Sequence, residues 1–281
     1  MQCCWQTFIN VLPIWMRQEV DRLGKDQMQE LRLRVDQPPE LVFQNESKWL
    51  ERFVSQSDID FCINMASKYS PWTSDGIQKG YITISGGHRI GLCGLCITEG
   101  GSIKNYRAVT SVCIRVARQI SNISKRLYNL KDSVLIIGPP GVGKTTLMRD
   151  LIHQTSIHCY SHIVVVDERG ELFPSTQARF VFERGATTDI LCGCSKASGI
   201  EIALRTMNPQ IIAVDEVTSP EDTAAVINAA WCGVRLFATA HAMDRQDLFK
   251  RRQYKKLLEE KIFTTLITLH SDKTWQEDRL F

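Results

Sequence analysis

The stretch SVLIIGPPGVGKTT, residues 133–146, constrains the fold of this chain more than any other. Four consecutive apolar residues, 134–137, predict a buried strand, and TTLMRDLIHQ predicts a helix after it. Between them, residues 138–145 match G-x-x-x-x-G-K-[ST], a pattern whose glycines let successive backbone N–H groups point at phosphate oxygens. The N-terminus of the helix adds the positive end of its dipole. We therefore interpret the stretch as a phosphate-binding loop.

The loop assigns a role to two side chains and predicts two ligands. Lys144 would neutralise charge on the β- and γ-phosphates, and Thr145 would place its hydroxyl on a Mg²⁺ ion. The predicted nucleotide-binding residues are Gly138, Pro139, Pro140, Gly141, Val142, Gly143, Lys144, Thr145 and Thr146. The alternative is a Gly/Pro turn that matches the pattern by chance, but the strand before it and the helix after it favour binding of ATP with Mg²⁺.

Composition limits the class of protein. A chain of 281 residues suggests two domains, and 43% hydrophobic with 23% charged residues is typical of a soluble globular protein. The net charge of +3 is too small to imply nucleic-acid binding by itself. Ten cysteines without a secretory leader indicate reduced thiols, and no run reaches the ~18–20 apolar residues of a membrane-spanning helix. We expect a cytoplasmic protein without an integral membrane segment, able to dock peripherally through a membrane partner.

The first part of the chain predicts a smaller α+β domain, residues 1–120. Apolar spacing predicts an amphipathic helix over 1–25, broken near Pro13, and a further helix over 56–70. Strands are expected at 31–35, at 40–44 and on both sides of a Gly-Gly turn within 80–97. Residues 121–281 then form the domain that carries the phosphate loop.

Cys93 and Cys96 form a lone C-x-x-C inside the last of these strands. A zinc site would need a second pair or nearby histidines, and redox motifs with this spacing normally begin a helix. The pattern therefore favours two small buried residues over metal or redox chemistry.

Two apolar strands after the loop end in acids, and a third ends in a histidine. Residues 163–166 precede Asp167 and Glu168, 211–214 precede Asp215 and Glu216, and 234–240 precede His241. The carboxyl ends of parallel strands are where α/β sheets bind ligands. Asp215 would hold Mg²⁺ through water, and Glu216 would orient or deprotonate the attacking water. His241 fits two roles equally well, a sensor of the γ-phosphate and a structural histidine.

The remaining patterns complete the second domain. Ser219 and Pro220 mark the start of a helix that continues to Ala230. Residues 250–260, rich in Lys, Arg and Glu, favour a solvated helix over a nucleic-acid contact. Alternation over 262–269 predicts a closing edge strand.

Together these motifs resemble the secretion and pilus-retraction ATPases of the RecA-like P-loop class. The shared motifs are the phosphate loop, an acidic box at DERGE (167–171), Ala203-Leu204-Arg205 before a Pro-led strand at 209–216, and Thr239-Ala240-His241. The resemblance implies an α/β fold with a RecA-like P-loop parallel-sheet core and a smaller N-terminal α+β domain. It also implies a ring, of six subunits, that hydrolyses ATP.

Almost the whole chain further resembles the stage III sporulation protein AA family. The matching runs are ELRLRV at 30–35, GGHRIG at 86–91, IRVAR at 114–118, VDER at 166–169, and DIL followed by Gly193-Cys194 and Lys196-Ala197. Members are taken to be mother-cell ATPases of a channel complex between mother cell and forespore. The resemblance therefore implies membrane proteins of that channel as partners, and no nucleic acid.

The chain departs from the secretion pattern at the catalytic acids. It has Asp215-Glu216 where secretion ATPases usually have Gly-Glu, and DERGE where they have Asp-Pro-x-Glu. The spacing from Arg205 to Pro209 is also one residue longer. The catalytic base is therefore open among Glu168, Glu171 and Glu216.

Arginines ahead of the loop are candidates for action in trans. P-loop rings commonly complete each nucleotide site with an arginine of the adjacent subunit. Arg107, Arg115 and Arg118 precede the core, and each is also explained by a solvated basic face. Two other functions compete with a transport ATPase. Low charge and the lack of an aromatic-rich basic groove disfavour an ATPase acting on nucleic acid, and the full set of acids disfavours a non-hydrolysing scaffold.

Overall fold

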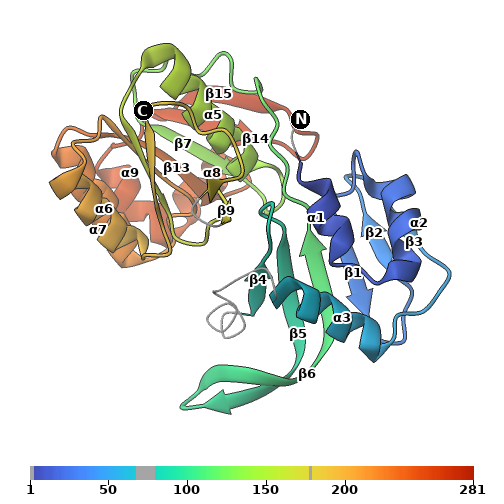
Figure 1. Cartoon of the computed structure of the whole chain (residues 1–281). Coiled ribbons are helices and arrows are strands. Elements are labelled where there is room, and N and C mark those ends of the chain that lie inside the picture. The colour runs from blue at the N-terminus through green and yellow to red at the C-terminus, as the bar shows by residue number, and fades with distance from the viewer. Residues whose placement is uncertain (1–2, 68–79, 177–178) are drawn as a thin grey trace. The chain divides into compact units, whose positions relative to one another are not determined.

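The computed structural model describes residues 3–67, 80–176 and 179–281 (Figure 1). Contacts divide these residues into two compact units. The core unit holds Gln119–Phe173 and Phe182–Phe281, and the N-terminal unit holds the described residues up to Arg118 together with Pro174–Val181. The division into domains 1–120 and 121–281 stays a prediction.

The N-terminal unit is an antiparallel sheet packed against helices. Its strand order is β3-β2-β1-β6-β5-β4. The strands are β1 (Glu30–Arg34), β2 (Glu40–Val42), β3 (Ser47–Trp49), β4 (Tyr81–Thr83), β5 (Arg89–Glu99) and β6 (Ser102–Arg115). The helices are α1 (Trp5–Asn10), α2 (Ile14–Gly24) and α3 (Gln56–Ser67). Alternating residues such as Leu31 and Leu33 enter a core shared with all three helices, as the sequence pattern predicts. The end of the predicted helix at 68–70 lies outside the described residues.

The long hairpin of β5 and β6 corrects the prediction for Cys93 and Cys96. All residues of β5 from Cys93 to Glu99 are exposed, so neither cysteine is buried. The prediction was wrong because β6 was not recognised, and the hairpin runs on past the part of the sheet that the helices cover (Figure 1). Among the described residues, no group of three or more His, Cys, Asp or Glu side chains is placed to hold a metal ion.

His88, from the Gly-Gly turn, ties three segments of the N-terminal unit together. Its ring is fully buried, and Nδ1 accepts the backbone N–H of Ala117 at 3.1 Å. Nε2 must therefore carry the proton, which it donates to the Cys4 carbonyl at 3.0 Å. Burial lowers the pKa of His88 to about 4, although the Cys4 carbonyl opposes the shift. The neutral ring thus fits its site, and the charged ring does not.

The stability of the protein should therefore fall in mild acid. Between the unfolded pKa of about 6.5 and the folded value, the unfolded chain binds a proton that the folded protein excludes. We expect His88 to cost about 2 kcal/mol of unfolding free energy when the pH falls from ~7.5 to ~5, and nothing above pH ~7. Urea unfolding at both pH values checks this. His88→Gln should lose that part of the pH dependence, and an unchanged dependence in this variant would contradict the assignment.

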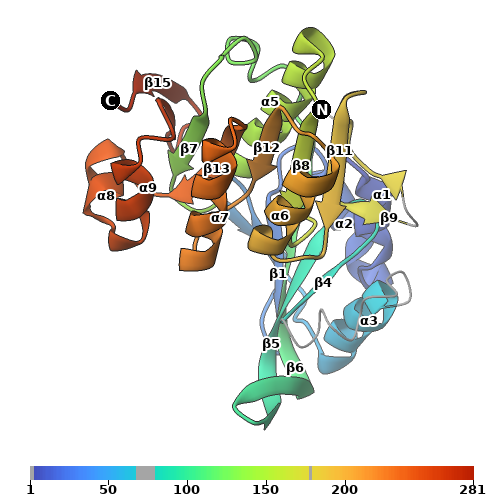
Figure 2. The ribbon, with the colours of Figure 1, turned by 90° about the vertical axis from the view of Figure 1, so that its left-hand side faces the viewer.

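The core unit is built on a seven-stranded sheet with the order β11-β8-β12-β13-β7-β14-β15 (Figure 2). Its strands are β7 (Val134–Gly138), β8 (Ile163–Asp167), β11 (Thr188–Cys192), β12 (Ile211–Val214), β13 (Arg235–His241), β14 (Thr265–Leu269) and β15 (Trp275–Arg279). Every pairing is parallel except that of β14 with β15. The short strands β9 (Ser175–Thr176) and β10 (Arg179–Phe180) pair with each other and belong to the N-terminal unit.

Helices cover both faces of this sheet. One face packs on α6 (Lys196–Thr206), α7 (Pro220–Trp231) and α9 (Lys255–Glu259) through a single apolar cluster. The helix after the phosphate loop, α5 (Lys144–Cys159), contributes no residue to that cluster and packs against β7 and β13 from the other side. The predicted charged helix at 250–260 is divided into the end of α8 (Arg245–Lys250), a 3₁₀ turn and α9.

The predicted edge strand at 262–269 proves to be interior. All five residues of β14 are buried, because β14 lies between β7 and β15. The sequence of β15, WQEDR, is polar and carries no apolar alternation, so it gave no strand signal.

Candidate active site

The phosphate loop leaves β7 and enters α5 at the carboxyl end of the parallel strands. Gly143, directly before the helix, has a φ of 111° that other residues rarely adopt. At Gly138, a Cβ atom would lie 2.8 Å from Val142 Cγ1 and 2.9 Å from the Leu269 carbonyl oxygen. The first glycine of the motif is thus required by close packing, and the last by backbone conformation.

Lys144 points back into the loop and is buried, with 5% of its surface exposed. Its Nζ donates to the carbonyls of Gly138 and Pro139, both at 2.9 Å, and lies 3.1 Å from His241 Nδ1. Burial lowers the pKa of Lys144, while the nearby carboxylates of Glu216 and Asp215 oppose that shift. Pro140 and Gly141 of the same loop are exposed, whereas the carbonyls of Gly138 and Pro139 replace water around the Lys144 ammonium.

Asp215 joins the loop to the second acidic strand. The Thr145 hydroxyl donates to Asp215 Oδ2 at 2.9 Å, and the Thr239 hydroxyl donates to Oδ1. Burial raises the pKa of Asp215, and the two hydroxyl donors oppose the rise. A hydroxyl and a carboxylate side by side are hard oxygen donors of the kind that bind Mg²⁺ together with phosphate oxygens.

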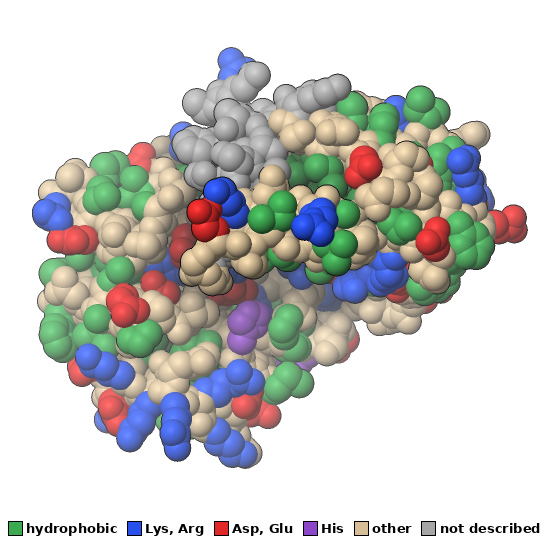
Figure 3. Space-filling view, turned by 90° about the horizontal axis from the view of Figure 1, so that it is seen from below, with side chains coloured by type: hydrophobic (Ala, Val, Ile, Leu, Met, Phe, Trp, Pro, Cys, Tyr) green, Lys and Arg blue, Asp and Glu red, His purple; other side chains and the backbone are tan. Residues whose placement is uncertain are grey.

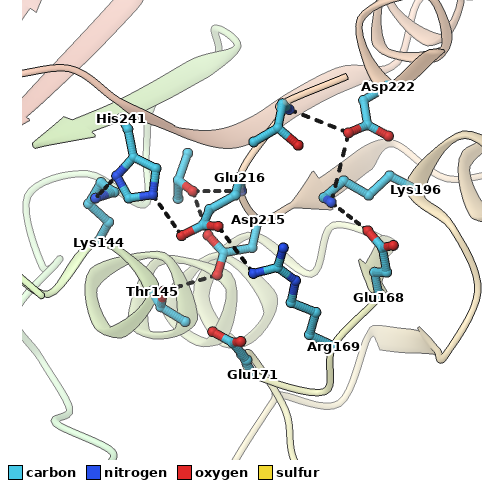
Figure 4. Close-up of polar contacts among 12 residues, drawn as sticks. Lys144, Thr145, Glu168, Arg169, Glu171, Lys196, Asp215, Glu216, Asp222 and His241 are labelled. Atoms are coloured by element: carbon cyan, nitrogen blue, oxygen red, sulfur yellow. Dashed lines mark hydrogen bonds and ion pairs between the residues drawn. The ribbon is translucent and has the colours of Figure 1, made fainter. Parts of the chain in front are cut away.

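Glu216 and His241 continue this network (Figure 4). An ammonium only donates, so His241 Nδ1 accepts from Lys144, and Nε2 then donates to Glu216 Oε1 at 2.9 Å. Arg169 Nη1 lies 3.6 Å from the other carboxylate oxygen. Glu216 has a φ of 49°, a conformation that costs a non-glycine residue about 1–3 kcal/mol. The Thr239 hydroxyl accepts its N–H at 2.8 Å, which holds the strained residue in place.

Glu168 belongs to a second, neighbouring network. Its carboxylate lies 2.6 Å from the Nζ of Lys196, a buried ammonium that is also 3.8 Å from Asp222. Asp222 in turn completes the predicted N-terminal cap of α7, exchanging hydrogen bonds with Ser219. Sequence reasoning missed Lys196 as a partner, because its partners come from two distant segments.

The backbone of the acidic loop that carries Glu171 is held by hydrogen bonds to two charged side chains. Asp167 accepts the backbone N–H groups of Glu171 at 2.9 Å and Phe173 at 2.8 Å. Arg149, buried on α5, donates to the carbonyls of Glu171 (2.9 Å) and Leu172. Burial lowers the pKa of Arg149 to about 10, against the pull of Asp167. Sequence reasoning missed Arg149, because its burial and its partners are visible only in the fold.

We expect Arg149→Met to destabilise the core unit and to disturb the acidic loop. The substitution leaves one buried and one partly buried carbonyl without their donor, which should lower the free energy of unfolding by about 2–4 kcal/mol. Denaturant unfolding measures the loss. Arg205→Met removes an exposed arginine that pairs with Glu201 on α6, and it should cost no more than about 0.5–1 kcal/mol. Equal stability of the two variants would contradict the role given to Arg149.

The structure brings most of the predicted site together. One pocket is lined by Asp167, Glu168, Arg169, Glu171, Lys196, Asp215 and Glu216. The phosphate loop and His241 adjoin it through the hydrogen bonds of Lys144 and Thr145 (Figure 4).

The three candidate arginines all belong to the N-terminal unit. Arg118 donates to the carbonyls of Gly24 (3.3 Å) and Lys25 (2.9 Å). Arg115 lies 3.3 Å from a carboxylate oxygen of Glu30. Arg107 is exposed on β6, without a hydrogen bond or ion pair to any described residue. Of the three, Arg107 is therefore the one whose guanidinium binds no described residue of its own unit.

Solved structures of secretion and pilus ATPases share this fold. The pilus retraction motor PilT, solved with ADP, superimposes with a TM-score of 0.60 at 17% identity, covering 92% of this chain and 78% of PilT. The ATPase DotB of Legionella pneumophila gives a TM-score of 0.54 at 14% identity, covering 95% of this chain and 80% of DotB. The predicted fold class, a RecA-like P-loop parallel-sheet core with a smaller N-terminal α+β domain, is confirmed. Within the described residues, no helix has the length and apolar character needed to span a membrane.

Sequence comparison gives the family. A protein of Bacillus subtilis (strain 168), stage III sporulation protein AA, is 36% identical over 276 residues, which cover 94% of this chain and 90% of that protein. The family model described as "Sporulation stage III, protein AA" matches residues 6–277. The chain belongs to the stage III sporulation protein AA family.

Proposed function

We propose that the protein is an ATP-hydrolysing motor of the secretion type that serves sporulation. It would act as a ring of six subunits in the channel complex between mother cell and forespore. The observation that carries the proposal is a continuous network beside the phosphate loop, in which the Thr239 hydroxyl connects two hydrogen-bonded groups. One group is Lys144, His241 and Glu216, and the other is Asp215 with Thr145. Family membership and the shared fold of PilT and DotB support it.

Each group in the network has a proposed task. The loop N–H groups and Lys144 bind the phosphates, and Thr145 and Asp215 hold Mg²⁺. When bound, Mg²⁺ supplies positive charge against the phosphate oxygens. His241 links Lys144 to Glu216, and its proposed task is to report the state of the γ-phosphate to the acid.

We assign the base to Glu216. Its carboxylate is linked through the imidazole of His241 to the lysine that would bind phosphate, whereas the charge of Glu168 is neutralised by Lys196. Glu171 lies in the same pocket and is proposed to orient the attacking water.

Three conservative variants separate the acids. We expect Glu216→Gln to bind ATP and to hydrolyse it about 10²–10⁴-fold more slowly, because the amide cannot take a proton. Glu171→Gln should slow turnover less. Any effect of Glu168→Gln on turnover should come mainly from the loss of the charged partner of Lys196. Single-turnover hydrolysis and ADP affinity of each variant give the comparison. Full activity in Glu216→Gln together with loss in Glu171→Gln would move the base to Glu171.

The proposed setting is the cytoplasm of the mother cell, with peripheral attachment through membrane proteins of the channel. A nucleic-acid-directed ATPase is the alternative. Figure 3 shows Lys and Arg side chains gathered at the lower left of one face with acidic side chains among them. In the basic segment after β13, Arg251 pairs with Asp247 at 2.9 Å, and Lys255 with Glu259 at 3.7 Å. This partial neutralisation weakens the attraction for a phosphate backbone.

The proposal is tested by ATP turnover and by native mass with and without a non-hydrolysable ATP analogue. We expect ATP hydrolysis, and a hexamer that the analogue stabilises. Adding DNA should leave turnover unchanged, and strong stimulation by DNA would favour the alternative. Tight ATP binding without turnover would instead make the protein a nucleotide-gated scaffold.

A further inference from the structure

A second lysine lies against the phosphate loop, and it comes from the turn between β14 and β15. The Nζ of Lys273 donates to the carbonyl oxygens of Gly141 at 3.0 Å and Val142 at 3.1 Å. Partial burial lowers the pKa of Lys273. A residue more than a hundred positions away in the chain thus holds the middle of the loop.

Sheet topology brings the turn there. β14 pairs in parallel with β7, with Thr268 opposite Ile137, so both strands leave the sheet at the same end. The contact between the hairpin and the loop is close. At Gly138 a Cβ atom would lie 2.9 Å from the carbonyl oxygen of Leu269, the last residue of β14. The loop therefore rests on the start of this turn.

The turn is itself held in one conformation. Asp272 Oδ1 accepts the N–H of Thr274 at 2.9 Å and its hydroxyl at 2.6 Å. The N–H of Lys273 donates to the His270 carbonyl at 3.0 Å. Lys273 adopts a left-handed φ of 70° within this frame. Its ammonium is thus presented to the loop by an ordered turn.

The contacts of Lys273 determine where two loop N–H groups point. In a trans peptide, the carbonyl of one residue and the N–H of the next point in opposite directions. Holding the carbonyls of Gly141 and Val142 toward Lys273 therefore turns the N–H groups of Val142 and Gly143 to the opposite side. Both glycines have positive φ, 74° and 111°, in a region where such peptide units rotate easily. The hydrogen bonds from Lys273 restrict the rotation of these peptide units in the nucleotide-free protein.

Lys144 holds the other part of the loop. Its Nζ donates to the carbonyls of Gly138 and Pro139, and the Nζ of Lys273 donates to two others. Two ammonium groups thus bind four carbonyls of the loop, two each. Lys273 also brings a positive charge, and its third N–H has no acceptor among the residues that the structure describes.

We propose that Lys273 is a positioning residue of the nucleotide site, which fixes the N–H groups of Val142 and Gly143 for the phosphates and adds a positive charge on the opposite side of the loop. The ligand it serves is the diphosphate of ADP or ATP. The inference rests on the proposed function and deepens it.

Lys273→Met tests the role, because it keeps the length of the side chain and removes its donors and charge. We expect the KM for ATP and the Kd for ADP and for pyrophosphate to rise about tenfold, with kcat within about twofold, since these contacts serve ground state and transition state alike. Lys273→Arg should restore most of the affinity. Lys256→Met, at an exposed lysine of α9, is the matched control and should change nothing.

Hydrogen exchange in the nucleotide-free protein gives a readout independent of hydrolysis. The amides of Val142 and Gly143 should exchange faster in Lys273→Met than in the control. Unchanged ADP affinity in Lys273→Met overturns the positioning role, and so does a lowered melting temperature with an unchanged KM. A wild-type protein that binds ADP but does not hydrolyse ATP overturns only the proposed motor function. If the wild type binds no nucleotide, both fail.

Discussion

Lys144→Ala is expected to abolish measurable ATP turnover and to weaken nucleotide binding. The residue is the cation that would meet the β- and γ-phosphates, and loss of one positioned donor to transition-state charge costs about 10²–10³ in rate. The effect should be larger here, because Lys144 also holds the carbonyls of Gly138 and Pro139 and contacts His241. A loss of loop order therefore accompanies the loss of charge.

The measurement is steady-state phosphate release, together with ADP affinity. Because Lys144 is buried, thermal unfolding of the variant must be measured as well, to separate lost chemistry from lost folding. A folded Lys144→Ala protein with wild-type turnover would exclude the phosphate loop as the site of hydrolysis.

The second large effect is expected from Arg107→Ala. An arginine supplied by a neighbouring subunit contributes about 10³–10⁵ to the rate in P-loop enzymes. Arg107 is favoured over Arg118, whose guanidinium already binds the carbonyls of Gly24 and Lys25. Arg118→Ala should therefore lower stability more than turnover per folded ring.

Mixed rings distinguish action in trans from action within one subunit. Arg107→Ala subunits keep their loops, and Lys144→Ala subunits keep their arginines, so each ring alone is inactive. In a 1:1 mixture, about a quarter of the interfaces join an intact loop to an intact arginine, as random assembly into a head-to-tail ring requires. About a quarter of wild-type turnover should return. Normal hydrolysis by Arg107→Ala alone in its oligomeric form would remove Arg107 as the trans arginine and leave Arg115 as the candidate.

The parts of the site that could be read from sequence are those whose chemistry is local. The phosphate loop needs glycines and Lys144 at fixed spacing, and the acids after β8 and β12 follow apolar strands directly. A parallel sheet then brings such strand ends together without further information, because the edge that binds ligands is the same for every strand.

The parts that could not be read depend on contacts between distant segments. Arg149 and Lys196 look like ordinary helix cations until the fold brings them to the acidic loop and to Glu168. Lys273 lies in a turn whose only sequence mark is polarity. Cys93 and Cys96 were wrongly predicted to be buried. A strand pattern does not show how far a hairpin extends beyond the helices that cover the sheet.

The last strand of the core sheet has a consequence for how copies of the protein meet. An exposed β edge offers unpaired N–H and C=O groups to any passing chain, and charged side chains are the usual protection. β15 carries Glu277, Asp278 and Arg279, and Arg279 lies 3.6 Å from Asp132. Pairing two such edges would remove water from the charged side chains of Glu277, Asp278 and Arg279. We therefore expect this margin to resist strand addition and aggregation, so that in the ring we propose the copies of the protein would meet through side-chain surfaces.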